Sequence, residues 1–181
     1  MVILRDLWRM APLSHSLPTH GDGATMQRLA KAVQVAADSD RFGEKLLFAN
    51  GRFDCKVSAK DTGGNLCVYD TIRTRKGGPP LHCHHNQDEW FFVRDGEFLF
   101  QIGEDKFRLK AGDSILGPAK VPHAFANISN TGVLMIVFQP AGTMEQFFLD
   151  GSRLTNPSQD DLQALYRAHG MEIVGPPLRV D

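Results

Sequence analysis

Three of the seven histidines, His82, His84 and His85, lie within four positions of one another. In an extended strand, residues two apart point to the same face, so His82 and His84 can converge on one point. Neutral imidazole is the commonest nitrogen ligand of iron, copper, nickel and zinc in proteins. The spacing therefore predicts half of a metal site, whereas His85 points the other way and is expected at the surface or beside the site.

A carboxylate and a third histidine complete the predicted ligand set. Glu89 begins an apolar run, where a buried carboxylate is unfavourable unless it binds a cation. His123 alternates with Phe125 in a second apolar run, and a lone histidine there would more often be a core residue than a ligand. The histidine pair upstream weakens the core interpretation without deciding between the two. His82, His84, Glu89 and His123 are therefore the candidate ligands of one divalent metal.

These residues resemble the two sequence motifs of the cupin superfamily. The first motif has a His-X-His pair, a glutamate and a later glycine, which are matched here by His82, His84, Glu89 and Gly96. The second motif is matched by Gly112, Pro118, His123 and Asn127. Two positions depart from the family: Lys120 stands where a glycine is usual, and the leading glycine of the first motif is shifted by one residue. Both positions concern turn geometry and neither supplies a ligand.

The resemblance implies an all-β fold, the cupin jelly roll or double-stranded β-helix barrel, with a 3-His/1-Glu metal site. Within the superfamily, residues 78–91 look most similar to single-domain quercetin 2,3-dioxygenase-like proteins. This similarity implies oxygen-dependent ring cleavage of a small aromatic, flavonol-like substrate. Two alternatives stay open: a metal-dependent isomerase, lyase or decarboxylase, and a non-catalytic cupin that binds a small molecule.

The predicted ligands limit which metals suit the site and indicate which residues line the substrate pocket. Three imidazoles and one carboxylate suit Fe, Mn, Ni, Co or Cu, and suit tetrahedral zinc less well. Phe91 and Phe125 share strand faces with the ligands, so we expect them to line the substrate pocket. In such dry surroundings the pKa of Glu89 is expected to be raised, which would suit a catalytic base. Asp88 is expected in a solvated turn.

Three regions are predicted from the periodicity: an N-terminal arm (1–44), a cupin barrel (45–141) and a C-terminal helical extension (142–181). In the arm, an amphipathic helix is predicted from the spacing of Met26, Leu29, Ala30 and Val33. The barrel consists of short apolar runs separated by turn signals, which we interpret as hairpins, as at Asn50-Gly51, Asp95-Gly96 and Gly112-Asp113. In the extension, Asn156-Pro157-Ser158 resembles a helix start with Pro157 in the first turn, and Gly170 stands where a C-terminal cap is expected. Pro176-Pro177 is expected to end regular structure.

Composition indicates a globular protein with small-molecule partners. Lys plus Arg is 20 and Asp plus Glu is 21, and this balance argues against nucleic acid or an anionic membrane as a partner. The three cysteines are expected to be free thiols, and with no secretory signal in the sequence we expect a cytoplasmic location. The cupin resemblance implies three partners: a small-molecule substrate, O₂ as its co-substrate, and a second copy in a homodimer, in which exchange of the N-terminal arm is one way to cover an open sheet edge.

Overall fold

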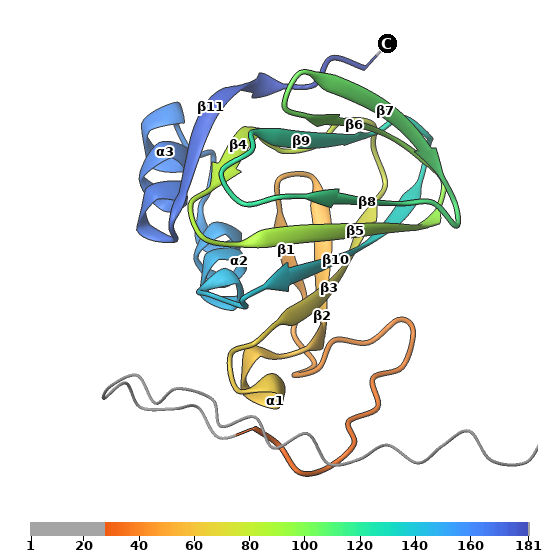
Figure 1. Ribbon diagram of the computed structural model, residues 1–181, viewed down its shortest axis with the longest axis vertical. Helices are drawn as coiled ribbons and strands as arrows, with labels where there is room; N and C mark the ends of the chain where they lie inside the picture. Colours follow the sequence, from red (N-terminus) through yellow and green to blue (C-terminus); the bar gives the residue numbers. More distant parts are fainter. Residues whose placement is uncertain (1–27, 181) are drawn as a thin grey trace, which may run out of the picture.

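Two antiparallel sheets face each other in the computed structural model, which describes residues 28–180 (Figure 1). In spatial order, the six-stranded sheet contains β1 (Leu46–Phe48), β2 (Gly51–Val57), β3 (Cys67–Arg73), β10 (Gly132–Gln139), β5 (Asp88–Asp95) and β8 (Ser114–Gly117). The five-stranded sheet contains β11 (Met171–Pro177), β4 (Pro80–His84), β9 (His123–Asn127), β6 (Glu97–Ile102) and β7 (Asp105–Lys110). The helices are α1 (Ala59–Thr62), α2 (Met144–Arg153) and α3 (Gln159–Ala168). The predicted jelly-roll sandwich with a helical C-terminal part is confirmed.

Alternation along the strands builds the core between the sheets. In β5, Glu89, Phe91 and Val93 are buried, whereas Asp88 and Trp90 are exposed. The same period-2 pattern recurs in β10, which pairs with β3 on one side and with β5 on the other. This is the register that the sequence predicted for Glu89. It places a carboxylate inside the sandwich, in a row with large apolar side chains.

Glycine turns occur where the sequence predicts them, but not all of them close hairpins. Asn50-Gly51 does join the paired strands β1 and β2, with Asn50 in the left-handed region (φ 62°). In contrast, Gly96 (φ 78°) connects β5 to β6, and Gly112 (φ 94°) connects β7 to β8. Both of these turns carry the chain from one sheet to the other. The hairpin interpretation is therefore wrong at these two positions, because a positive φ reverses the chain without deciding which strand it pairs with next.

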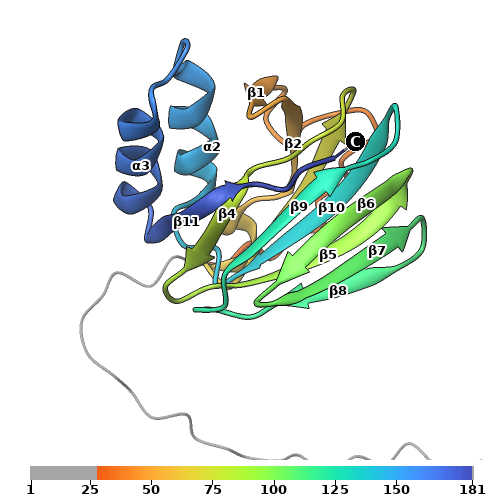
Figure 2. The ribbon, with the colours of Figure 1, turned by 90° about the horizontal axis from the view of Figure 1, so that it is seen from above.

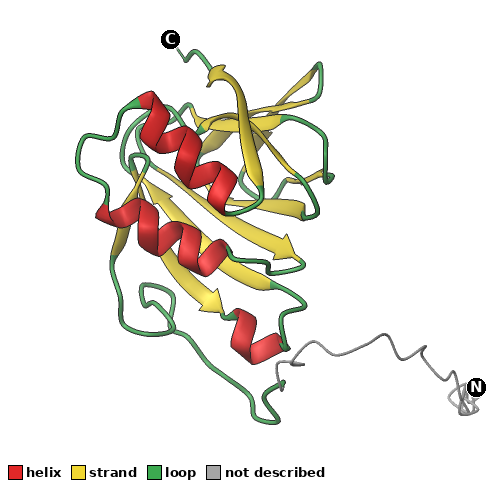
Figure 3. Cartoon of the chain, turned by 90° about the vertical axis from the view of Figure 1, so that its left-hand side faces the viewer, coloured by secondary structure: helices red, strands yellow, loops and turns green. Residues whose placement is uncertain are grey.

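The helices α2 and α3 lie together at one end of the sandwich, beside β1, β4 and β11 (Figures 2 and 3). A helix does begin beside the predicted Asn156-Pro157-Ser158 start, but Pro157 precedes it: Ser158 is the N-cap, and its side chain accepts a hydrogen bond from the Asp161 amide in a capping box. In α2, buried residues recur at helical spacing, at Met144, Phe147, Phe148 and Gly151. Phe148 stacks on Phe53 of β2 with ring centroids 4.3 Å apart, so α2 closes this end of the core.

The last strand was not predicted from the sequence. Residues 171–177 form β11, which pairs with β4 and includes the two prolines expected to end regular structure. Because β11 is the edge strand of its sheet, prolines that lack an N–H are tolerated there. Through this pairing Met171 lies opposite His84, and Ile173 lies opposite His82. The C-terminal segment thus flanks the strand that carries two predicted ligands.

The N-terminal arm differs from its prediction where it is described. Residues 28–45 are irregular, and Leu29 and Val33 of the predicted amphipathic stripe are 45% and 41% exposed. A short helix with no surface to pack on is marginal in water, which accounts for its absence here. Met26 lies outside the described residues. Within residues 28–180 no helix has the length and apolar character needed to cross a bilayer, and the cysteines Cys55, Cys67 and Cys83 are free thiols, as predicted.

Candidate metal centre

Strands from both sheets bring the four predicted ligands together. His82 and His84 are alternate residues of β4, and His123, the first residue of β9, lies directly opposite His82. Glu89 comes from β5 in the facing sheet, where it pairs with Phe138 and Gly117. The candidate ligand atoms of these residues all lie within 4.8 Å of one another. The site therefore spans the interior of the sandwich.

The cluster is enclosed by protein. His84 and His123 are each 1% exposed, Glu89 is 3% exposed and His82 is 6% exposed. Four buried polar groups in an apolar core are costly unless each has a partner. Two ligands of one metal ion can lie no more than about 4.4 Å apart when the bonds are about 2.2 Å long. The spacing of the ligand atoms therefore needs to contract by only a few tenths of an ångström.

Hydrogen bonds at the outer nitrogens orient all three imidazoles. Nδ1 of His82 donates to the carbonyl of Pro80 (2.8 Å), and Nδ1 of His123 donates to the carbonyl of Val121 (3.0 Å). Nδ1 of His84 donates to Oε1 of Gln87 (2.7 Å). Because each acceptor is an oxygen, the proton of the neutral ring must lie on Nδ1, and Nε2 is left with its lone pair. This is the arrangement in which histidines bind metals.

The remaining polar contacts lie inside the cluster. Nε2 of His123 lies 2.7 Å from Oε2 of Glu89. Without a metal this hydrogen bond needs a proton on Nε2, so the ring is then protonated at both nitrogens and donates to the carboxylate, whereas a bound metal would take the place of that proton. Nε2 of His84 lies 3.3 Å from the same oxygen without hydrogen-bond geometry, and it is buried with no partner. A buried ring nitrogen that lies close to a carboxylate and has no hydrogen-bond partner is typical of a cation-binding site. The residues therefore fit a divalent metal, which would be held by His82, His84, Glu89 and His123.

The electrostatics of the cluster differ from the sequence-based expectation for Glu89. Burial alone would raise the pKa of Glu89, but the hydrogen bond with His123 and the nearby His84 ring outweigh burial and hold this pKa well below its usual range. Burial also lowers the pKa of His123, yet the hydrogen bond and charge of Glu89 leave it above its ordinary value. The expected rise in the pKa of Glu89 is thus wrong, because two imidazoles lie inside the dry environment with it.

The pKa of His82 is shifted downward, in the opposite direction to that of His123. Burial lowers the pKa of this imidazole to about 3, and the neighbouring His123 and His84 add to the effect. His82 is therefore neutral at physiological pH and ready to act as a ligand.

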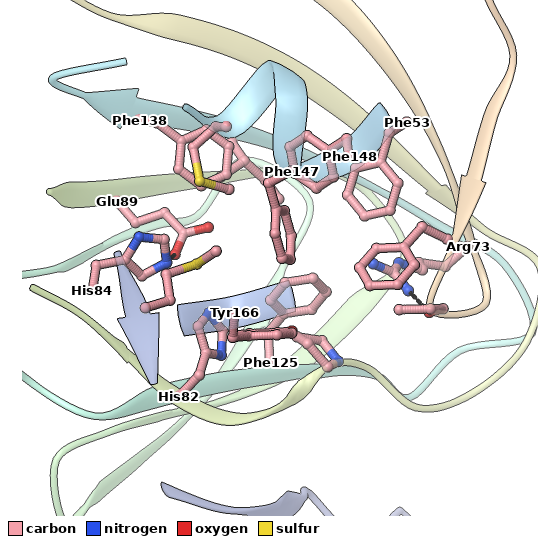
Figure 4. Close-up of a pocket in the computed structure, with 16 residues that line it drawn as sticks. Phe53, Arg73, His82, His84, Glu89, Phe125, Phe138, Phe147, Phe148 and Tyr166 are labelled. Carbon is pink, nitrogen blue, oxygen red and sulfur yellow. Dashed lines mark hydrogen bonds and ion pairs between the residues drawn. The ribbon is translucent and has the colours of Figure 1, made fainter. Parts of the chain in front are cut away.

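One side of the cluster opens into a cavity of about 40 Å³ (Figure 4). His82, His84 and Glu89 border this cavity, and its other walls are mostly aromatic and apolar. Phe125 lines it, as predicted. Phe91 does not: it is 1% exposed and packs behind His123, with ring centroids 6.0 Å apart.

His85 and Asp88 are exposed, as predicted, but Asp88 begins strand β5 and does not lie in a turn. Its side chain accepts a hydrogen bond from the Ala119 amide (2.8 Å). The unusual Lys120 adopts the left-handed conformation that glycine would favour (φ 67°), and its amide donates to the carbonyl of His84 (2.7 Å). The loop thus keeps its shape despite the substitution. Asn127 binds backbone carbonyls in the adjoining loops and has a structural role.

Three residues of the site were not identified from the sequence. Gln87 orients His84, whereas Tyr166 and Arg73 line the cavity. Arg73 carried a usable signal, because in the apolar run 67–73 it lies on the same alternate positions as Cys67 and Tyr69. An arginine on an inward-facing row is unusual and points to an internal role.

Comparison with known proteins agrees with this architecture. Residues 71–138 match the family model of the cupin domain, Cupin_2. An uncharacterized protein of Methanocaldococcus jannaschii is 38% identical over 50 residues, which are 28% of this chain and 40% of that protein. The chain therefore matches less than half the length of this relative.

Three solved structures are similar to parts of the chain. The RmlC-like cupin of Shewanella frigidimarina has 17% identity and a TM-score of 0.49, over 64% of this chain and 96% of that chain. KdgF from Halomonas sp. has 21% identity and a TM-score of 0.46, over 50% of this chain and 79% of that chain. A predicted oxalate decarboxylase of Thermotoga maritima has 17% identity and a TM-score of 0.48, over 50% of this chain and 80% of that chain.

Proposed function

We propose that this protein is a metal-dependent dioxygenase that acts on a small organic molecule held in the aromatic cavity. The observation that supports the proposal best is the ligand set, in which three oriented Nε2 atoms converge with one carboxylate. A divalent metal bound there would polarise a substrate oxygen and make reaction with O₂ accessible. The side of the site that faces the cavity provides the opening that a catalytic centre needs and a closed structural centre lacks.

The surrounding side chains exclude water and orient the substrate. Phe125, Phe147 and Tyr166 line the cavity beside the ligands and give it an apolar surface. Glu89 is the one carboxylate among the described residues that line the cavity, so in this proposal the carboxylate of Glu89 accepts the proton of a substrate hydroxyl. The low pKa of Glu89 keeps it ionised at neutral pH, which is the form that binds a metal or accepts a proton.

The volume of the cavity limits the size of the substrate that it can hold. Sites for drug-sized ligands measure roughly 300–1,000 Å³, whereas this cavity measures about 40 Å³. A three-ring flavonol would fit only if α2 moved away from the sheets. We therefore propose a substrate of a few non-hydrogen atoms in place of a flavonol.

A non-oxidative metal enzyme, such as a decarboxylase or lyase, is the second candidate. The observation that favours it is a buried arginine, Arg73, in the same cavity, which suits an acidic substrate. Lewis-acid chemistry on such a substrate would need no oxygen.

An oxygen electrode separates these functions. The protein would be loaded with Fe, Mn, Co, Ni or Cu and tested with small enediols, catechols and 2-oxo acids. We expect oxygen uptake with at least one substrate, lost in Glu89→Gln and retained in the exposed neighbour variant Asp88→Asn. Turnover that continues without oxygen would favour the second candidate. Absence of turnover under both conditions would contradict both.

A further inference from the structure

A buried arginine lies across the cavity from the metal ligands. Arg73 is the last residue of β3 and is 1% exposed. Its guanidinium carbon lies 5.2 Å from the ring centroids of both Phe53 and Phe125, so two aromatic rings flank the cation. Figure 4 shows Arg73 at one end of the cavity and the pair His84 and Glu89 at the other, with aromatic side chains between them.

The structure gives this cation very few partners. A guanidinium has five N–H donors, and one of its terminal nitrogens donates to the carbonyl of Ala49 (2.5 Å). Its Nε is buried with no hydrogen-bond partner. Within residues 28–180, no carboxylate oxygen lies within 4.0 Å of its nitrogens. A buried charge without a counterion is strongly unfavourable, so the fold retains Arg73 at a cost.

Arg73 remains a cation despite its surroundings. Burial lowers the pKa of its guanidinium to about 10, which still leaves it protonated at neutral pH. The fold also leaves space for it, because a Cβ on Gly51 would lie 2.7 Å from its guanidinium carbon. The hydroxyl of Thr71, two residues before Arg73 on the same face of β3, is a second buried polar group without a hydrogen-bond partner.

We propose that the cavity binds a small carboxylic acid, with the guanidinium of Arg73 as the group that recognises the carboxylate. A carboxylate is planar, accepts paired hydrogen bonds from a guanidinium fork and neutralises the buried charge. The short cavity between Arg73 and Glu89 fits an acid of a few non-hydrogen atoms with an apolar body. The inference deepens the proposed function and rests on it in one respect, namely that the bound acid is the substrate that reaches the metal.

Charge counting supports an anionic ligand. With neutral histidines, Glu89 contributes one negative charge to the cavity and Arg73 one positive charge, so a divalent metal would leave a net charge of about +2. A monocarboxylate reduces this excess, whereas a neutral ligand leaves it unchanged. Recognition of the acid therefore stabilises the cation at one end of the cavity and the metal at the other.

The test uses propionate and its isosteric amide, propionamide, with the full-length protein labelled with ¹⁵N. Binding is followed by NMR on the backbone amides and on the Nε–H signal of Arg73. We expect propionate to bind about tenfold or more tightly than propionamide, because a charge-assisted pair replaces a neutral one. The Nε–H signal of Arg73 should shift with propionate and stay in place with propionamide.

Three variants assign the selectivity. Arg73→Met should remove the preference for the acid, Arg73→Lys should keep part of it, and Arg153→Met, at an exposed arginine, should leave it unchanged. His84→Ala removes a metal ligand but keeps Arg73, so the preference should persist there even if the metal chemistry of the proposed function fails.

The proposal is overturned if the two probes bind equally, if neither binds, or if the preference survives in Arg73→Met. It is also overturned if His84→Ala alone abolishes the preference, since the metal would then recognise the acid. If Arg73→Met does not fold, Arg73→Lys and the Nε–H shift decide the question.

Discussion

Gln87 is expected to control metal affinity without touching the metal. Its Oε1 accepts the Nδ1 proton of His84 (2.7 Å), and its Nε2 donates to the carbonyls of Pro140 (2.6 Å) and Ala141 (3.0 Å). All three bonds are lost in Gln87→Ala. The His84 ring then lacks the contact that fixes its tautomer and direction.

The expected losses of metal affinity and of stability follow from the hydrogen bonds that Gln87→Ala removes. Loss of a hydrogen-bond partner outside the ligand shell typically weakens metal binding 10- to 100-fold, which corresponds to about 1.4–2.7 kcal/mol. Leaving the Nδ1–H of His84 buried and unpaired costs about 1–3 kcal/mol of stability. For a chain of this size, that loss lowers the melting temperature by about 2–12 °C.

A second substitution separates affinity from stability. Gln87→Glu keeps an oxygen for His84 but cannot donate to the two carbonyls. We expect it to lose stability for a different reason, because a buried carboxylate oxygen would then face two carbonyl oxygens, while it keeps metal affinity within a few-fold of the wild type. Gln101→Ala is the control, because Gln101 also donates to one backbone carbonyl (3.0 Å) but lies outside the site.

The assay is competition with a chromogenic chelator, together with calorimetric melting of each variant. Wild-type metal affinity in Gln87→Ala would refute the role given to the hydrogen bond. Equal losses of affinity in Gln87→Ala and Gln87→Glu would show that the oxygen acceptor is not what matters.

Three further predictions follow from the structure. Gly78→Ala should destabilise the protein by about 3 kcal/mol in urea unfolding, since a Cβ there would lie 1.8 Å from the Phe125 carbonyl oxygen; a loss below about 1 kcal/mol would contradict that close approach. Lys120→Gly should raise the free energy of unfolding by about 0.5–1 kcal/mol, because Lys120 has φ 67°, a left-handed conformation that glycine adopts without strain. A lower free energy of unfolding in the same measurement would contradict this. In metal-free protein, the pKa of His123 is raised chiefly by Glu89 against the effect of burial, so its contribution to stability is complete below about pH 6.5 and is lost as pH rises through the raised value. Metal affinity, which requires the deprotonated ring, should rise over the same interval, as chelator competition at several pH values would show; an affinity that does not change with pH would contradict the assignment.

Spacing predicted three of the four ligands, His82, His84 and Glu89, because their placement depends on local strand geometry. His82 and His84 share a strand face, and Glu89 is separated from Asp88 by the period of two, which the structure reproduces. What brings His123 opposite His82 is a pairing between strands about 40 residues apart. No local pattern specifies such a pairing, so for His123 the family resemblance supplied what periodicity could not.

The misjudged features share one cause, which is dependence on tertiary context. The turns at Gly96 and Gly112 have the predicted conformation, but only the sandwich decides that they connect different sheets. β11 was missed because prolines in an edge strand look the same in sequence as prolines that end a strand. The pKa of Glu89 was expected to rise because burial was foreseen and the proton of His123 was not.

Metal content per chain tests the central claim most directly. Protein purified without chelator would be measured by plasma mass spectrometry beside His84→Ala and the matched control His85→Ala, which removes an exposed histidine one residue away. We predict about one transition-metal ion per chain in the wild type and in His85→Ala, and loss of the ion in His84→Ala. No ion in any of the three proteins after reloading, or equal retention in His84→Ala, would contradict the metal centre.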